Sequence, residues 1–178
     1  MSATTRRARA VRIAPSEVVV RHGADGSIYM RARTPLGPFQ TRLTDSLDHW
    51  ASHAPDRTVR AQRDGDGWRR VSYAAALTRV RRLAQALLDR RLSHDRPIVI
   101  LSGNSIEHGL LALAAMYAGV PYVPAAPAYS LQATEFTALH RIFERVEPAL
   151  VFTDGDFALV SRLEEHRAAR QVAAVDGG

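Results

Sequence analysis

The residues whose types and spacing most suggest chemistry lie in residues 103–107, with the sequence GNSIE. A hydrolase nucleophile elbow has the pattern G-x-S-x-G and places its serine on a tight turn between a strand and a helix, which would make Ser105 a nucleophile. Asp154 and His166 follow in the order of a hydrolase triad. Glu107 stands where the elbow needs a small residue. We therefore favour a polar turn that caps a helix, and keep a small hydrolase using Ser105 as the alternative.

Two further groups of polar residues have a structural interpretation. His49 and His53 are four residues apart and share a face of a predicted helix, but a zinc-protease helix would have Glu where this chain has Trp50. The paired aspartates are typical of turns; they are Asp64, Asp66, Asp154 and Asp156. We therefore assign no catalytic, cofactor-binding or metal-binding residue from the pattern.

The composition excludes several kinds of chemistry. The chain of 178 residues has no cysteine, and all 24 of its basic residues are arginine. It therefore carries no thiol nucleophile, no Schiff-base lysine and no P-loop lysine. The net charge is +6, but the arginines are scattered among acids without a nucleic-acid-binding motif, so we expect no nucleic-acid partner. No apolar run reaches the roughly 18 residues that span a bilayer, so we expect no membrane partner.

The elements that must position these residues are organised around residues 97–127. Ile98–Leu101 is an apolar, β-branched run typical of a buried strand. We predict a helix over Ser105–Ala118 that is capped by Asn104, with Glu107 at the third helical position. Gly119 ends this helix, and Tyr122-Val123 begins a second strand. A right-handed crossover makes the two strands parallel.

The pattern of elements along the chain predicts an α/β fold with a doubly wound, mostly parallel sheet. From about residue 97 the elements follow the order β-α-β-α-β-α-β. Before the sheet we predict two β-hairpins, 18–20 with 28–30 and 59–63 with 68–72, and two helices, 45–54 capped by Thr44 and 73–91 capped by Ser72. After residue 123 we predict helices over 132–146 and 157–169, and strands over 149–153 and 171–175. Ligands of such sheets bind at the carboxyl ends of the strands, here residues 102–105, 125–130 and 154–156.

Several segments resemble a known family. Residues 116–124 (MYAGVPYVP) and 71–77 (VSYAAAL), together with Trp50-Ala51 and residues 54–58 (APDRT), resemble motifs of the adenylate-forming, AMP-binding superfamily of acyl-CoA synthetases. Residues 35–39 (PLGPF), 101–105 (LSGNS) and 126–131 (APAYSL) are similar to its feruloyl-CoA synthase branch. The resemblance covers nearly all of the chain after Val11.

The resemblance implies an ATP-dependent acid–CoA ligase that activates an aromatic acid, a hydroxycinnamate such as ferulate, as an acyl-adenylate and transfers it to CoA. ATP, CoA and Mg²⁺ are implied for a longer parent protein, and we expect none of them to bind tightly to this chain. Residues 13–178 would form an incomplete N-terminal part of the AMP-binding domain, after a flexible basic arm over residues 1–12. The family's phosphate-binding loop, its magnesium-binding acid, its ribose-binding aspartate and its catalytic lysine would all follow residue 178.

We therefore expect this chain alone to be inactive and cytoplasmic, with its oligomeric state left open. A non-catalytic binding module or pseudoenzyme of the same fold remains the second alternative.

Overall fold

The first compact unit of the chain is a β-hairpin. The computed structural model describes residues 17–130, 135–153 and 173–176, and divides the chain into residues 1–39 and 40–178. In the first unit β1 (Val18–His22) pairs antiparallel with β2 (Ile28–Ala32), as predicted. Gly26 in the connecting turn has a φ of 83°, a conformation that an Asp-Gly turn provides readily.

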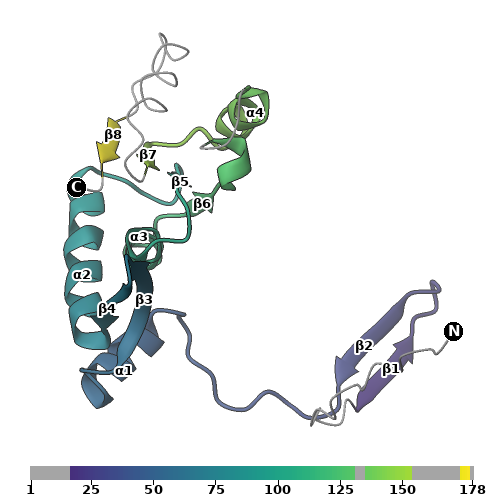
Figure 1. Ribbon diagram of the computed structural model, residues 1–178. Coiled ribbons are helices and arrows are strands. Elements are labelled where there is room, and N and C mark those ends of the chain that lie inside the picture. Colours follow the sequence, from purple (N-terminus) through teal and green to yellow (C-terminus); the bar gives the residue numbers. More distant parts are fainter. Residues whose placement is uncertain (1–16, 131–134, 154–172, 177–178) are drawn as a thin grey trace, which may run out of the picture. The chain divides into compact units, whose positions relative to one another are not determined.

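The second unit opens with two helices that flank another hairpin (Figure 1). The elements are α1 (Asp45–His53), β3 (Thr58–Asp64), β4 (Gly67–Ser72) and α2 (Tyr73–Asp89). Strands β3 and β4 are antiparallel. The predicted cap of α2 is confirmed, because Ser72 Oγ accepts a hydrogen bond from the backbone N–H of Ala75.

The rest of the second unit forms the predicted parallel sheet. Its elements are β5 (Ile98–Leu101), α3 (Ile106–Ala118), β6 (Tyr122–Pro124), the short 3₁₀ helix η1 (Pro127–Tyr129), α4 (Thr137–Val146), β7 (Leu150–Thr153) and β8 (Ala173–Asp176). The strand order is β6-β5-β7-β8, and every neighbouring pair is parallel. The chain therefore leaves β5 in one direction to form β6 and returns past it to form β7, which is the doubly wound arrangement.

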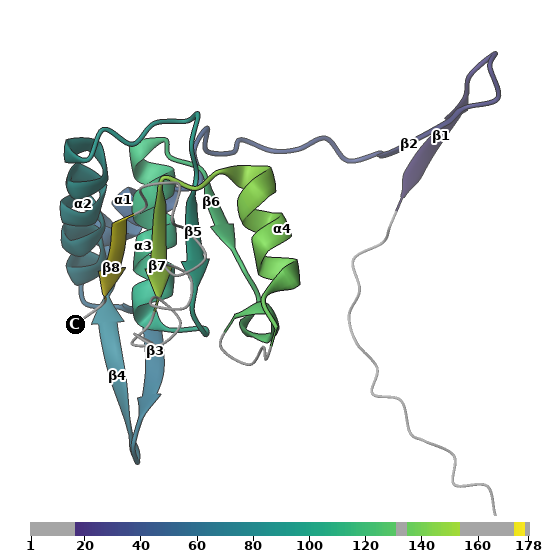
Figure 2. The same ribbon diagram turned by 90° about the horizontal axis from the view of Figure 1, so that it is seen from above.

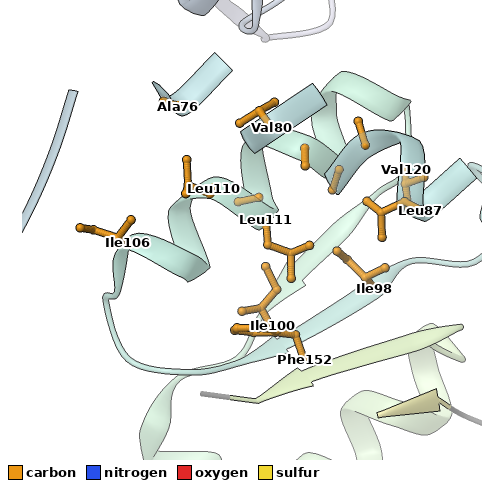
Figure 3. Packing of buried hydrophobic residues seen from close by; sticks show 14 of the residues in the cluster. Ala76, Val80, Leu87, Ile98, Ile100, Ile106, Leu110, Leu111, Val120 and Phe152 are labelled. Atoms are coloured by element: carbon orange, nitrogen blue, oxygen red, sulfur yellow. The ribbon is translucent and has the colours of Figure 1, made fainter. Parts of the chain in front are cut away.

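Two separate cores cover the two faces of this sheet. Ile98 and Ile100 of β5 face the core that also contains side chains of α2 and α3 (Figure 3). Val99 and Leu101 face a second core, which includes Leu139 of α4. Helices α3 and α4 accordingly lie on opposite sides of the sheet (Figure 1), and the strands between them are seen from another side in Figure 2. All four β5 side chains are fully buried, as expected for a strand covered on both faces.

Several predicted boundaries and the predicted cap of α1 were wrong. Thr44 has helical backbone angles and its side chain makes no capping hydrogen bond, so it does not cap α1 as predicted. Helix α2 ends at Asp89 rather than at residue 91, because Arg91 adopts a left-handed φ of 55° that no helix continues. Helix α4 begins at Thr137, and its predicted first residues at 132–134 lie outside the described residues. The predicted helix over 157–169 also lies outside them.

Candidate functional site

The edge at the carboxyl ends of β5 and β7 is the candidate functional site. The strand order changes direction between these two strands, and ligands of doubly wound sheets bind outside such a point. The loop after β5 supplies Ser102 to Ser105, and Thr153 ends β7 in register with Leu101. Of the other predicted edge residues, 125–130 follow β6, whereas 154–156 lie outside the described residues.

Ser102 and His108 form a hydrogen-bonded pair at this edge. Ser102 Oγ lies 2.9 Å from His108 Nδ1, and the same nitrogen lies 3.1 Å from the carbonyl oxygen of Gly103. A carbonyl can only accept, so we assign the proton of neutral His108 to Nδ1, which donates to both oxygens. This nitrogen then has no lone pair with which to take a proton from Ser102. The pair therefore fixes the loop after β5 and is not a nucleophile with its base.

The cap of α3 is Ser105 and not Asn104, which corrects the sequence prediction. Ser105 has extended backbone angles, and its Oγ accepts a hydrogen bond of 3.1 Å from the backbone N–H of His108. Asn104 is exposed. With the cap one residue later, Glu107 is the second helical residue and forms no capping box. Ser105 is only 6% exposed and has a structural role in the described part of the chain, so nothing there supports the hydrolase alternative.

Glu107 instead ties α3 to the hairpin β3–β4. Arg69 Nη1 and Nη2 donate to Glu107 Oε1 and Oε2 at 2.6 and 2.7 Å. The hydrogen bond from Arg69 holds the pKa of Glu107 below its ordinary value. Gln62 Oε1 accepts from the backbone N–H of Ile106 at 2.9 Å and also from Arg69. The contacts with α3 join residues that are 38 and 44 positions apart in the sequence.

The contacts leave little room for an anion at the start of α3. The free N–H groups of a helix N-terminus are what commonly bind a phosphate. Here Gln62 accepts from Ile106, and Ser105 accepts from His108 through its side chain and from Gly109 through its carbonyl. Protein groups therefore occupy most of the positions that a phosphate would use.

The described candidates outside this edge are the two histidines of α1 and the two aspartates near the β3–β4 turn. The rings of His49 and His53 stack on α1 at 4.1 Å between their centres, and His53 Nδ1 lies 2.8 Å from the carbonyl oxygen of His49. Asp64 is the last residue of β3, and Asp66 lies in the turn between β3 and β4. In the part of the chain that the structure describes, no three His, Asp or Glu residues are placed to hold a metal ion. Asp154 and His166 lie outside that part.

Comparison with known proteins decides the family. Residues 47–177 match the sequence pattern of the AMP-binding enzyme family. The chain belongs to the AMP-binding enzyme family. The match includes the whole parallel sheet and the edge described above, so the fold inferred from the resemblance is confirmed at the level of the family.

Several solved structures of other proteins share this fold. One is the fatty acyl-adenylate ligase of L. pneumophila, with 15% identity and a TM-score of 0.62, for which the match covers 76% of this chain and 23% of that one. A second is a benzoate CoA ligase of Burkholderia xenovorans LB400, with 19% identity and a TM-score of 0.62, for which the match covers 78% of this chain and 26% of that one. A third is the acyl-CoA synthetase of Brucella canis, with 19% identity and a TM-score of 0.60, for which the match covers 75% of this chain and 23% of that one. This chain therefore spans about a quarter of the length of these three proteins.

The described residues do not fit a magnesium nucleotide of the kind that the AMP-binding family implies. The chain has no lysine, and the loop after β5 has a single glycine. No acidic cluster for a cation occurs among the residues whose structure is described. In this part of the chain we also find no helix that is both long and apolar enough to cross a membrane. At the edge of the sheet, the described polar groups mainly form hydrogen bonds with one another.

Proposed function

We propose that this chain is the first part of the AMP-binding domain of a longer ATP-dependent acid–CoA ligase. The observation that supports this is the family match over residues 47–177, set against structures in which the matched region is only about a quarter of the chain. Residues 13–178 would form the incomplete domain, after a basic arm over residues 1–12. The longer protein would use ATP and CoA with Mg²⁺, and would work in the cytoplasm.

The reaction of the longer ligase has two steps. The substrate carboxylate attacks ATP and releases pyrophosphate, which leaves an acyl-adenylate. The thiol of CoA then attacks the acyl carbon, a thioester forms, and AMP leaves. None of the residues described here is assigned a part in either step, since the edge at β5 satisfies its own polar groups.

An aromatic acid is the substrate class that we propose, and a hydroxycinnamate such as ferulate its specific member. The resemblance of residues 35–39, 101–105 and 126–131 to the feruloyl-CoA synthase branch supports the specific member. The benzoate CoA ligase among the similar structures acts on an aromatic acid, as its name states, which is in keeping with the class.

The first experiment tests the chain alone. Pyrophosphate release is measured with the purified 178-residue protein, ATP, CoA, Mg²⁺ and ferulate, with a complete acid–CoA ligase as the positive control. We expect no turnover above the rate without enzyme. Turnover that depends on both ATP and ferulate would show that the 178-residue chain catalyses the reaction by itself, and would overturn the proposal.

The second experiment tests the longer protein. The genomic DNA after codon 178 is sequenced, and we expect an open frame that encodes a loop rich in Gly, Ser and Thr and ending in Lys. The protein from the extended frame should release pyrophosphate with ferulate faster than with benzoate or a fatty acid. A stop codon directly after residue 178 would instead favour a non-catalytic binding module or pseudoenzyme. Activity only with aliphatic acids would overturn the substrate class.

A further inference from the structure

Two histidine rings lie side by side on helix α1 (Figure 1). His49 and His53 are four residues apart, which places their side chains on the same face of the helix. Their rings are stacked, with 4.1 Å between the ring centres and an angle of 23° between the ring planes. No described part of the second unit buries either side chain. The two imidazoles are therefore close enough for one metal ion to contact both.

A hydrogen bond of His53 determines which of its ring nitrogens could bind a metal. His53 Nδ1 lies 2.8 Å from the carbonyl oxygen of His49. A carbonyl oxygen only accepts, so we assign the proton of neutral His53 to Nδ1, which leaves the lone pair on Nε2. A histidine that binds a metal almost always donates its other ring N–H to a carbonyl or a carboxylate, which orients the ring and makes the ligating nitrogen more basic. His53 has this arrangement.

The ring of His49 is held less firmly than that of His53. It stacks on His53 and makes an edge contact with Trp50, at 5.0 Å between the ring centres. No hydrogen bond of the His49 ring is found among the described residues. Rotation of this side chain can therefore turn a ring nitrogen toward the lone pair of His53 Nε2. A metal ion at the usual distance of about 2.0–2.1 Å from both nitrogens would then join two adjacent turns of one helix.

We propose that His49 and His53 form a binding site for a divalent transition-metal ion, with Cu²⁺ bound more tightly than Zn²⁺. Neutral imidazole suits both ions, and sites of this kind have their highest affinity for Cu²⁺. The sequence favoured two histidines without a metal because Trp50 replaces the glutamate of a zinc protease. That glutamate is the general base and not a ligand, so its absence does not weaken metal binding. The site is independent of the proposed ligase activity.

The carboxylates of α1 are bound to other groups, which determines the class of metal. Asp45 forms an ion pair with Arg42 at 2.7 Å, and Asp48 accepts a hydrogen bond from Arg81 at 2.8 Å. The proposed site therefore consists of two imidazoles, and water would take the remaining coordination positions. Mg²⁺ and Ca²⁺ prefer oxygen ligands, so neither ion should bind there.

The test is calorimetric titration of the full chain, prepared without a histidine tag, with CuCl₂, ZnCl₂ or MgCl₂ at neutral pH. His49→Asn should weaken Cu²⁺ binding at least about tenfold, since even the loss of a group that only supports a metal ligand costs about 10- to 100-fold. This variant keeps the backbone carbonyl that accepts from His53, so it removes a ligand without changing the orientation of the other. The control His22→Asn/His94→Asn removes two other exposed histidines and should bind Cu²⁺ as the wild type does.

Tryptophan fluorescence gives a second readout that needs no histidine variant. The chain has two tryptophans, Trp50 and Trp68, and the ring of Trp50 contacts that of His49. In Trp68→Phe, Cu²⁺ should quench the remaining fluorescence over the same concentrations at which calorimetry detects binding, because a paramagnetic ion at His49 would lie beside Trp50. In Trp50→Phe, the fluorescence of Trp68 should be quenched less over these concentrations.

Three outcomes would overturn the proposal. They are an unchanged Cu²⁺ affinity in His49→Asn/His53→Asn, an equal loss of affinity in the control His22→Asn/His94→Asn, and binding of Mg²⁺ as tight as that of Cu²⁺. Circular dichroism without metal shows whether each variant is folded. If a histidine variant is unfolded, the fluorescence of Trp68→Phe decides, and no quenching by Cu²⁺ in that protein would also overturn the proposal.

Discussion

The phenolic hydroxyl of Tyr117 on α3 donates a hydrogen bond to Asp48 on α1, with 3.0 Å between Tyr117 Oη and Asp48 Oδ1. Arg81 of α2 donates to the same carboxylate oxygen at 2.8 Å. One side chain of α1 thus links α1 with both α2 and α3. The two residues that contact directly are 69 positions apart in the sequence.

Replacing Tyr117 by Phe removes this hydrogen bond and also the one that Tyr117 Oη accepts from Arg81 Nε at 3.3 Å. We expect the free energy of unfolding to fall by about 1–2 kcal/mol, because the acceptor is charged and partly shielded from water. Urea denaturation followed by circular dichroism measures the change. Tyr122→Phe is the control, since the Tyr122 hydroxyl makes no hydrogen bond to another described residue. In the double variant Tyr117→Phe/Asp48→Ala the two losses should not add, and additive losses would contradict a direct interaction.

The ion pair of Arg69 and Glu107 predicts a pH-dependent stability. The hydrogen bond from Arg69 lowers the pKa of Glu107 in the folded protein. The stabilisation by this ion pair is therefore fully present above the pKa of Glu107 in the unfolded chain, about 4.5, and is lost as the pH falls through the pKa of the folded protein. At pH 7 the free energy of unfolding of Glu107→Gln should be about 0.5–1 kcal/mol lower than that of the wild type, as expected for a partly exposed ion pair. This difference should shrink steadily below pH 4.5.

The control for the pH experiment is Glu144→Gln, which changes an exposed glutamate of α4 for which no ion pair is found among the described residues. Unfolding by urea is measured for both variants between pH 3 and pH 7, a range chosen to bracket the ordinary glutamate pKa of about 4.3. A difference for Glu107→Gln that stays constant across this range would show that the carboxylate charge contributes nothing at this position.

The correction of the α3 cap can be tested with neighbouring residues. Ser105→Ala removes the side-chain oxygen that accepts from the His108 N–H, and should lower the free energy of unfolding by about 1 kcal/mol. Asn104→Ala, one residue earlier, should change it by less than about 0.5 kcal/mol, as do most exposed substitutions. Thermal unfolding of the two variants is compared under identical conditions. A larger loss for Asn104→Ala would restore the cap that the sequence suggested.

Gly119 ends α3 with a left-handed φ of 72°, and nothing surrounds the position where a Cβ would be placed. Gly119→Ala should therefore destabilise the protein through backbone strain alone, by about 1 kcal/mol. Gly103 provides a matched control, because a Cβ there also meets no atom within 4 Å while its φ is not in the left-handed region. Both variants are compared by urea denaturation, and equal effects would show that α3 does not end in the left-handed conformation.

The sequence could predict the order of the elements and the parallel sheet, because those depend on local patterns. The run Ile98–Leu101 and the glycine at 119 are visible without any long-range information. The cap of α3 could not be predicted in this way, because Asn104 and Ser105 are both good caps by residue type. The choice depends on which of them is the last residue with extended backbone angles before the helix, and this is Ser105. Thr44 looked like a cap from its type alone, but its helical backbone angles do not present the hydroxyl to the first turn.

The interactions at the candidate site could not be predicted, because they join separate elements. Arg69 and Glu107 are 38 residues apart, and nothing near either of them indicates the other. The sequence does not single out His108, because this residue has no metal-ligand spacing with another histidine. Its position six residues after Ser102, on the first turn of a helix that follows a strand, is the signal that could have identified the pair.

The order β6-β5-β7-β8 has a consequence for how the protein is made. On the ribosome, β5 emerges before either of its neighbours, and β6 can pair with it after about 20 further residues. Its other neighbour, β7, begins at Leu150, about 50 residues after Ile98. At roughly 5–20 residues per second, one edge of the most apolar strand stays unpaired for several seconds during translation. Nascent chains that pause between codons 125 and 150 should therefore be bound by a chaperone that recognises extended apolar segments.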